Sequence, residues 1–200
     1  MGAIEKIFAN LPALETDRLL LRHMTRKDVH DMFEYTSDPE ISLYTTWHAH
    51  QSINDTMRFI EHNLSLQEKQ QVHEWAIVEK KSRKMIGTCG YVWWKPQHHI
   101  AEIAYAIARP LWGKGFMSEA VQAVLKFGFE QMELNRIEAR CMLGNVGSER
   151  VMQKAGMTFE GILREQMYAK EQFHDLKLYA ILKRDWLSPS TLYEDKEGLT

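Results

Sequence analysis

The sequence predicts one α/β domain in which helices cover the faces of a mixed sheet. Its 200 residues lie within the usual size of a single domain and suffice to bury a sizeable core. Hydrophobic residues make up 44% and charged residues 26%, which excludes a disordered or collagen-like chain. Short apolar runs alternate with amphipathic stretches that begin at capping signatures. This order of elements predicts about seven strands and about four helices.

The first half of the chain is predicted to contribute one strand and two helices, followed by three strands. Residues 18–24 form a short apolar run, and two [ST]xxD signatures follow, at Thr25 with Asp28 and at Ser52 with Asp55. Behind the second signature, apolar side chains recur at helical spacing: Ile53, Met57, Ile60 and Leu64. Apolar runs bounded by turns then predict three strands: residues 75–78, 85–94 and 100–108.

The second half is predicted to hold two strand–turn–helix units and a closing hairpin. A turn at residues 110–115 leads into a helix with these residues along one face: Met117, Val121, Val124, Gly128 and Met132. Residues 137–143 return as a strand, and Asn145 opens a helix that ends at Gly156. The hairpin strands are residues 157–169 and 173–182. Because ligands of open α/β sheets bind beyond the carboxyl ends of strands, the turns after residues 108 and 143 are the expected location of a site.

Charge and cysteine content exclude several classes of protein. The 25 Lys and Arg residues against 27 Asp and Glu give a net charge of −2, without the basic excess of a nucleic-acid-binding protein. Cys89 and Cys141 lie in apolar runs, which argues against a disulfide framework and fits a reducing, cytoplasmic location. The sequence shows neither a secretory signal nor a run of about 18 apolar residues, so we expect no membrane contact. His48 and His50 lack a third ligand, so we expect no metal site.

The turn at residues 110–115 is the clearest candidate for a binding site. Gly113 and Gly115 allow the backbone to curl so that successive N–H groups point at one spot, where the positive end of the next helix favours a phosphate. A connector that binds nothing is the alternative that a lone GxG leaves open. The turn is not a P-loop, because Ala108 stands at the first glycine position. It is not a dinucleotide fingerprint, because Ser118 stands at the third.

Three separated stretches within residues 101–186 carry a resemblance to a known family. They read AEIAYAIARPLWGKGFMSEAV, LNRIEARCMLGNVGSERVMQKAGMTFEGILRE and HDLKLYAILKRDW, and the earlier LETDRLLLR is similar as well. They resemble the GCN5-related N-acetyltransferase superfamily, specifically its ribosomal-protein N-acetyltransferase-like branch. In that family the turn reads Q/R-x-x-G-x-G/A and holds the pyrophosphate of acetyl-coenzyme A. Gly113 and Gly115 match this pattern, whereas Pro110 stands where Gln or Arg is usual.

The resemblance implies a fold, a cofactor and a location. The fold is a twisted, mostly antiparallel sheet over residues 14–187, with an N-terminal extension at 1–13 and a polar tail at 188–200. The enzyme would be cytoplasmic and would use acetyl-coenzyme A as co-substrate without a metal. The resemblance leaves open whether the protein forms a homodimer. By position in the family motifs, the residues implied in cofactor binding are Ile107, Ala108, Arg109, Gly113, Lys114, Gly115, Phe116, Met117, Ser118, Asn145, Ser148 and Arg150.

Several of these positions also have a purely structural interpretation. The resemblance implies that a backbone N–H near Ile107 or Ala108 polarises the thioester carbonyl, but small residues in this strand equally suit tight packing. Asn145 would contact the pantetheine arm, yet Asn is among the best N-caps and capping alone explains it. Arg150 and Lys154 could contact the nucleotide phosphates, or they could be ordinary exposed helix charges.

Two residues are candidates for proton transfer. Glu102 is a carboxylate in an apolar strand, where burial would raise its pKa, and we expect it to act as a base through water. An outward-facing or salt-bridged strand residue is the competing interpretation. Ser148 would protonate the leaving thiolate directly or through water. Some members of the branch carry a Glu in the penultimate strand, where this sequence places Met167, and Glu165 is out of register with it.

The sequence says least about which amine accepts the acetyl group. The branch favours the α-amine of a protein N-terminus, such as that of a ribosomal protein. Two alternatives are a small-molecule amine (an antibiotic, a polyamine or an amino-acid conjugate) and a non-catalytic acyl-coenzyme A-binding module. Aromatic residues that could wall an acceptor cleft, or fill the core instead, are Trp47, Tyr91, Trp93 and Trp94. His73 and Glu74 are expected at a solvated strand edge or in that cleft.

Overall fold

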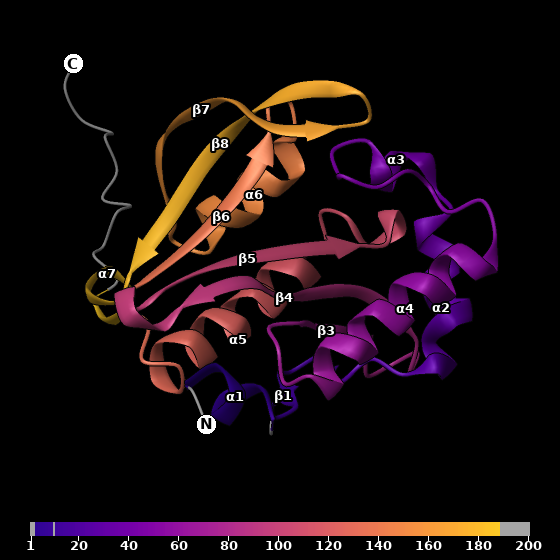
Figure 1. Ribbon diagram of the computed structural model, residues 1–200, viewed down its shortest axis with the longest axis horizontal. Coiled ribbons are helices and arrows are strands. Elements are labelled where there is room, and N and C mark those ends of the chain that lie inside the picture. The colour runs from indigo at the N-terminus through magenta and orange to yellow at the C-terminus, as the bar shows by residue number, and fades with distance from the viewer. Residues whose placement is uncertain (1–2, 10, 189–200) are drawn as a thin grey trace, which may run out of the picture.

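The computed structural model describes residues 3–9 and 11–188, and its centre is an eight-stranded sheet in the order β1-β2-β3-β4-β5-β6-β8-β7 (Figure 1). Neighbouring strands are antiparallel except β5 and β6, which run parallel. The strands are β1 (Leu14–Glu15), β2 (Leu19–Arg22), β3 (Glu74–Glu79), β4 (Met85–Lys95), β5 (Ile100–Ile107), β6 (Arg136–Met142), β7 (Thr158–Ala169) and β8 (Gln172–Leu182).

Helices cover both faces of this sheet. They are α1 (Ala3–Phe8), α2 (Val29–Thr36), α3 (Pro39–Ser42), α4 (Ile53–Glu68), α5 (Phe116–Glu130), α6 (Val146–Lys154) and α7 (Lys183–Leu187). Within the residues that the structure describes, no helix is long and apolar enough to cross a membrane. Both predicted capping boxes are confirmed, because Asp28 and Asp55 accept hydrogen bonds from the N-cap backbone N–H groups of Thr25 and Ser52.

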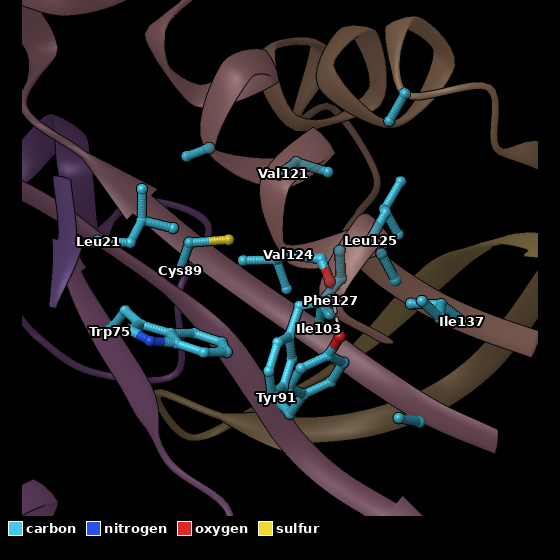
Figure 2. Packing of buried hydrophobic residues seen from close by; sticks show 14 of the residues in the cluster. Leu21, Trp75, Cys89, Tyr91, Ile103, Val121, Val124, Leu125, Phe127 and Ile137 are labelled. Carbon is cyan, nitrogen blue, oxygen red and sulfur yellow. Dashed lines mark hydrogen bonds between the residues drawn. The ribbon is translucent and has the colours of Figure 1, made fainter. Parts of the chain in front are cut away.

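The core lies mainly between α5 and the face of the sheet that α5 crosses. The ring of Trp75 meets that of Phe127 edge to face, with 5.5 Å between the ring centroids (Figure 2). The buried Tyr91 hydroxyl donates to the Val124 carbonyl at 2.7 Å, so this tyrosine both packs and fixes the helix. A second apolar cluster, around Met32 and Ile60, lies under α2 and α4 on the opposite face.

The prediction of a mixed, mostly antiparallel sheet with flanking helices is confirmed. The strand beyond the predicted seven is β1, whose two residues are too short for any periodicity to reveal. The helices beyond the predicted four are the short α1, α3 and α7. The predicted hairpin turns through Lys170 and Glu171, both with positive φ (52° and 63°), as a two-residue turn between twisted strands requires.

Two apolar residues near the N-terminus, Phe8 and Leu11, contribute to the domain core. Phe8 and Leu11 are 1% and 3% exposed, and the Phe8 ring lies 5.4 Å from that of His73. This segment, expected as an extension, therefore docks on the sheet in the residues described. Of the expected polar tail, residues 189–200 lie outside the described residues.

One break in the sheet matters for function. Strand β5 pairs with β4 along its whole length, from Ile100 to Ile107. It pairs with β6 only from Ile100 to Ile103, opposite Arg136 to Ala139. Beyond that point the two strands diverge, and β6 with its partners β8 and β7 turns away from the rest of the sheet (Figure 1).

Candidate active site

The divergence of β5 and β6 leaves one edge of β5 unpaired, and the direction of its backbone groups can be read from one hydrogen bond. The Ala108 N–H donates to the Ile86 carbonyl of β4 at 2.9 Å. Because paired residues alternate along an antiparallel ladder, the backbone groups of Ala106 also face β4, whereas those of Tyr105 and Ile107 face the gap. The Ile107 carbonyl accepts a hydrogen bond from the Trp112 indole N–H at 3.0 Å. By the same alternation, the Ile107 N–H is directed into the gap.

The glycine turn closes the carboxyl end of β5. Gly113 and Gly115 have φ of +73° and +80°, a left-handed conformation that favours glycine. Gly115 is the N-cap of α5 and supplies no side-chain cap, so the first-turn N–H groups of Phe116, Met117 and Ser118 have no capping side chain. A helix N-terminus of this kind, with a curled glycine turn before it, is suited to bind an anion.

Arg18 was not among the residues expected from the sequence, and its side chain holds this turn in place through contacts with Lys114 and Phe116. Its Nη1 donates to the Lys114 carbonyl at 3.1 Å, and its guanidinium lies 4.2 Å from the centroid of the Phe116 ring. The same side chain pairs with Glu119, with 2.6 Å between Nε and Oε2. Only tertiary structure brings residues 18 and 114 together, and no local pattern signals the contact.

The second strand–turn–helix unit places Asn145 and Ser148 beside the same gap. Asn145 is the N-cap of α6, and its Oδ1 accepts the Ser148 N–H at 3.0 Å. The Ser148 hydroxyl lies 3.0 Å from the hydroxyl of Tyr105, which comes from the diverging part of β5. Asn145 therefore caps α6 through its Oδ1, and the NH2 of its side chain takes no part in this cap. The Ser148 hydroxyl connects α6 to β5.

Glu102 lies on the opposite face of β5 from Tyr105, and it is neither exposed nor free of partners. Its side chain is 13% exposed; Oε2 accepts from the Trp93 indole and lies 3.6 Å from Arg140 Nη1. Burial raises the pKa of Glu102, and the positive charge of Arg140 and the Trp93 hydrogen bond oppose that rise. Both sequence interpretations of Glu102 therefore apply: it is ion-paired, and it is a carboxylate whose pKa lies above its usual range.

The other expected positions divide between the turn and the surface. Arg109 is exposed and its Nε pairs with Asp38 Oδ2 at 2.6 Å, which ties the turn to α3. Lys114 lies in the turn, and its main-chain N–H donates to Leu111. Arg150 and Lys154 lie exposed on α6.

The aromatic and histidine candidates mostly belong to the core. Tyr91 and Trp94 are 1% and 8% exposed and belong to the core, although Tyr91 also lines a shallow pocket with His73 and Glu74. Trp93 reaches the Glu102 carboxylate. His73 is 3% exposed rather than at a solvated edge, and burial raises the pKa of the neighbouring Glu74. In the part of the chain that is described, no cluster of three or more His, Cys, Asp or Glu residues could hold a metal.

These features define the class of protein. An unpaired strand edge that leads to an anion-binding helix N-terminus fits an extended thioester with a phosphate-bearing handle, and a buried carboxylate lies on the same strand. No side chain in the gap has the character of an activated nucleophile: Cys141 is buried and its pKa is raised to about 11, chiefly by that burial. These features fit an acyltransferase whose acyl donor is such a thioester.

Comparison with known proteins gives the family. The family model described as Acetyltransferase (GNAT) domain matches residues 18–158, and the chain belongs to this family of N-acetyltransferases. Uncharacterized N-acetyltransferase p20 of Bacillus licheniformis is 34% identical over 176 residues, which is 88% of this chain and 99% of that protein. The ribosomal-protein-serine acetyltransferase of Escherichia coli is 28% identical over 130 residues, covering 65% and 72%.

A solved structure supports the fold. The ribosomal L7/L12 alpha-N-protein acetyltransferase in complex with coenzyme A superimposes with a TM-score of 0.75 at 20% identity, covering 86% of this chain and 98% of that one. That protein binds coenzyme A, and this chain shares its fold. The sequence did not indicate Tyr105 or Arg18 as residues of the site, and it offered Trp93 as a wall of the acceptor cleft rather than as the hydrogen-bond partner of Glu102. The signal nearest to one of them is the single tyrosine among the small residues of β5.

Proposed function

We propose that this N-acetyltransferase takes its acetyl group from acetyl-coenzyme A bound between β5 and β6 and transfers it to the α-amine of a protein N-terminus. The observation that carries the proposal is the unpaired edge of β5 beyond Ile103, which ends at the left-handed turn of Gly113 and Gly115. A pantetheine arm has amide groups that can pair with such an edge. Its pyrophosphate suits the uncapped first turn of α5. When bound, acetyl-coenzyme A supplies an activated acyl group.

Polarisation of the thioester carbonyl falls to the Ile107 N–H. Of the two candidate amides, that of Ala108 is already committed to the Ile86 carbonyl, whereas that of Ile107 faces the gap. A donor fixed in a strand needs no reorganisation as negative charge develops on the carbonyl oxygen. Asn145, at the start of α6, is the candidate contact to the pantetheine arm.

The acceptor nitrogen must lose a proton, and Glu102 is the proposed base. About 16 Å separates the Cα atoms of residues 102 and 107 at about 3.3 Å per strand residue, so Glu102 acts through water rather than directly. Ala104 and Ala106 lie on the same face between them, and their small side chains leave room for that water and for the amine. The raised pKa of Glu102 makes it a stronger base than an ordinary carboxylate.

The class of acceptor amine can be inferred from how far the amine depends on a base to lose its proton. At pH about 7.4 an α-amine with a pKa of about 7.7–8.0 is neutral roughly a fifth to a third of the time, whereas a lysine amine is neutral about once in a thousand. A base that works through water suits the first better. The relative from Escherichia coli that is named for ribosomal-protein serine acetylation supports the same choice. A small-molecule amine is the second candidate acceptor.

The proposal is tested by ligand binding followed by turnover. Acetyl-coenzyme A at about a hundred times its Kd should stabilise the protein by about 2.7 kcal/mol, and thiol release should follow on addition of N-terminal peptides. Stabilisation without thiol release from peptides but with release from small amines would identify the second candidate. Stabilisation with no release from either would identify an acyl-coenzyme A-binding module. If acetyl-coenzyme A does not stabilise the protein, the proposal that it is the co-substrate is wrong.

Ser148 gives a sharper test of the same site. If its hydroxyl meets the leaving sulfur, Ser148→Ala should lower kcat by about tenfold, the effect of one lost hydrogen bond to a charged group, with a smaller change in the affinity for acetyl-coenzyme A. Steady-state kinetics with the best peptide of the panel measure both. An unchanged kcat would remove Ser148 from the reaction.

A further inference from the structure

The hydroxyl groups of Tyr105 and Ser148 form a pair at the edge of the gap between β5 and β6. The Tyr105 oxygen lies 3.0 Å from Ser148 Oγ and 3.2 Å from the Ser148 carbonyl oxygen. We propose that Tyr105 is a positioning residue that turns the Ser148 hydroxyl toward the sulfur of coenzyme A and strengthens its hydrogen bond to the leaving thiolate. This inference rests on the proposed function and adds to it the group that controls Ser148.

A count of protons shows why the pair has two states. The Tyr105 hydroxyl has one hydrogen, and the Ser148 carbonyl oxygen can only accept. When Tyr105 donates to that carbonyl, the Ser148 hydroxyl can satisfy Tyr105 by donating back to its oxygen. Its own hydrogen is then directed away from the gap. When Tyr105 instead donates to Ser148 Oγ at 3.0 Å, the Ser148 hydrogen is free to point into the gap.

Charge on the sulfur selects the second state. A thioester sulfur is a weak acceptor, whereas a thiolate is a strong one that gains from a donated hydrogen bond. The chain from Tyr105 through Ser148 to sulfur is then aligned in one direction, so each bond polarises the next. The pair therefore stabilises the charge that appears on sulfur as the carbon–sulfur bond breaks, more than it stabilises the bound thioester.

No proton needs to leave either hydroxyl for this effect. A thiol with an ordinary pKa of about 8.5 is a stronger acid than a phenol or an alcohol, so full transfer from Ser148 to the thiolate is uphill. Burial further raises the pKa of Tyr105, which keeps its proton on the phenol oxygen. Ser148 and Tyr105 act as donors of hydrogen bonds, and the free thiol takes its proton from solvent.

The thiol of bound coenzyme A reports on this pair without any acceptor. Its pKa is measured by titrating the ultraviolet absorbance of the thiolate in the saturated complex, with the free protein as blank. Ser148→Ala should raise this pKa by about one unit or more, the effect of one hydrogen bond to a charged group. Tyr105→Phe should raise it by about a third of that amount, because it removes only the polarising partner.

Two controls separate a positioning role from a structural one. Tyr91→Phe removes another buried hydroxyl, one that donates to Val124 in the core, and should leave the thiol pKa unchanged while lowering stability. Adding Tyr105→Phe to Ser148→Ala should change nothing further, because Tyr105 acts through Ser148. If Tyr105→Phe fails to fold, difluorotyrosine placed at position 105 keeps the ring and donates more strongly. It should then lower the thiol pKa, the opposite shift.

The outcomes are distinct. A Tyr105→Phe complex with the wild-type thiol pKa, or a shift that adds to that of Ser148→Ala, overturns the inference and leaves the proposed function standing. Failure of the wild-type protein to bind coenzyme A in calorimetry overturns the proposed function, and this inference with it.

Discussion

The two edges of β5 are built from the same eight residues and have opposite properties. Toward β4, the strand is paired from Ile100 to Ile107, and the next amide, that of Ala108, continues the pairing. Toward β6, pairing stops at Ile103. The paired edge fixes the position and orientation of the strand, so that the open edge can present backbone groups without collapsing onto a neighbour. A backbone donor held in this way is already oriented for a substrate.

The comparison is tested most strongly by removing one amide from each edge. Replacing the peptide bond between residues 106 and 107 with an ester removes the N–H that faces the gap, and kcat should fall by about 10²–10³. Stability should fall by less than about 1 kcal/mol, because the ester also weakens the Ala106 carbonyl as an acceptor toward β4. The matched ester at residue 108 removes the N–H that binds Ile86, so stability should fall by about 1 kcal/mol with kcat retained. Steady-state kinetics and chemical denaturation measure the two effects. A similar loss of kcat in both variants would contradict the assignment of Ile107.

The paired edge should also tolerate no added volume. A Cβ atom on Gly87 would lie 2.3 Å from the Ala106 carbonyl oxygen, a backbone atom that cannot move aside. Gly87→Ala should therefore cost about 3 kcal/mol and lower Tm by about 6–12 °C. Gly147 in α6 is the matched control, because its Cβ would meet only Asn145 Oδ1, at 3.8 Å, and Gly147→Ala should stabilise by about 0.5–1 kcal/mol. Thermal melts that rank the two variants the other way would show that the strand relaxes.

Glu102 should reveal itself in the pH dependence of the rate. Its carboxylate is the active form, so kcat/KM should rise with pH through its raised pKa. Glu102→Gln should lose that limb and about tenfold in rate at neutral pH. The pH dependence of stability should have the opposite sign to that of kcat/KM. Because the folded state raises this pKa, wild-type stability falls as pH increases from the unfolded carboxyl pKa to the folded one, and Glu102→Gln should not show that fall. A wild-type pH–rate profile in the variant would remove Glu102 from the mechanism.

Local signals in the sequence were sufficient for much of this site. The capping pattern at Asn145, the left-handed positions of Gly113 and Gly115, and the strand that carries Glu102 each depend on a few neighbouring residues, so a single stretch of chain encodes them. The contact between Tyr105 and Ser148 spans 43 positions and depends on the angle at which β6 leaves β5. No periodicity encodes that angle.

The environment of Glu102 illustrates the same limit. Alternation along β5 places it on the face opposite Tyr105, but only the register with β4 and β6 brings Trp93 and Arg140 to its carboxylate. The burial of Phe8 and Leu11 was missed for a related reason: six residues of helix carry too little periodicity to be distinguished from a loose extension.

The open edge of β5 can be tested most directly by amide hydrogen exchange, residue by residue, with and without acetyl-coenzyme A. In the free protein, the amides of Tyr105 and Ile107 should exchange faster than that of Ala108, which is bonded to Ile86. Saturation with acetyl-coenzyme A should slow the exchange of Tyr105 and Ile107 and leave that of Ala108 nearly unchanged. Binding without protection of these two amides would show that the cofactor lies elsewhere, and would contradict the assignment of the gap between β5 and β6 as the active site.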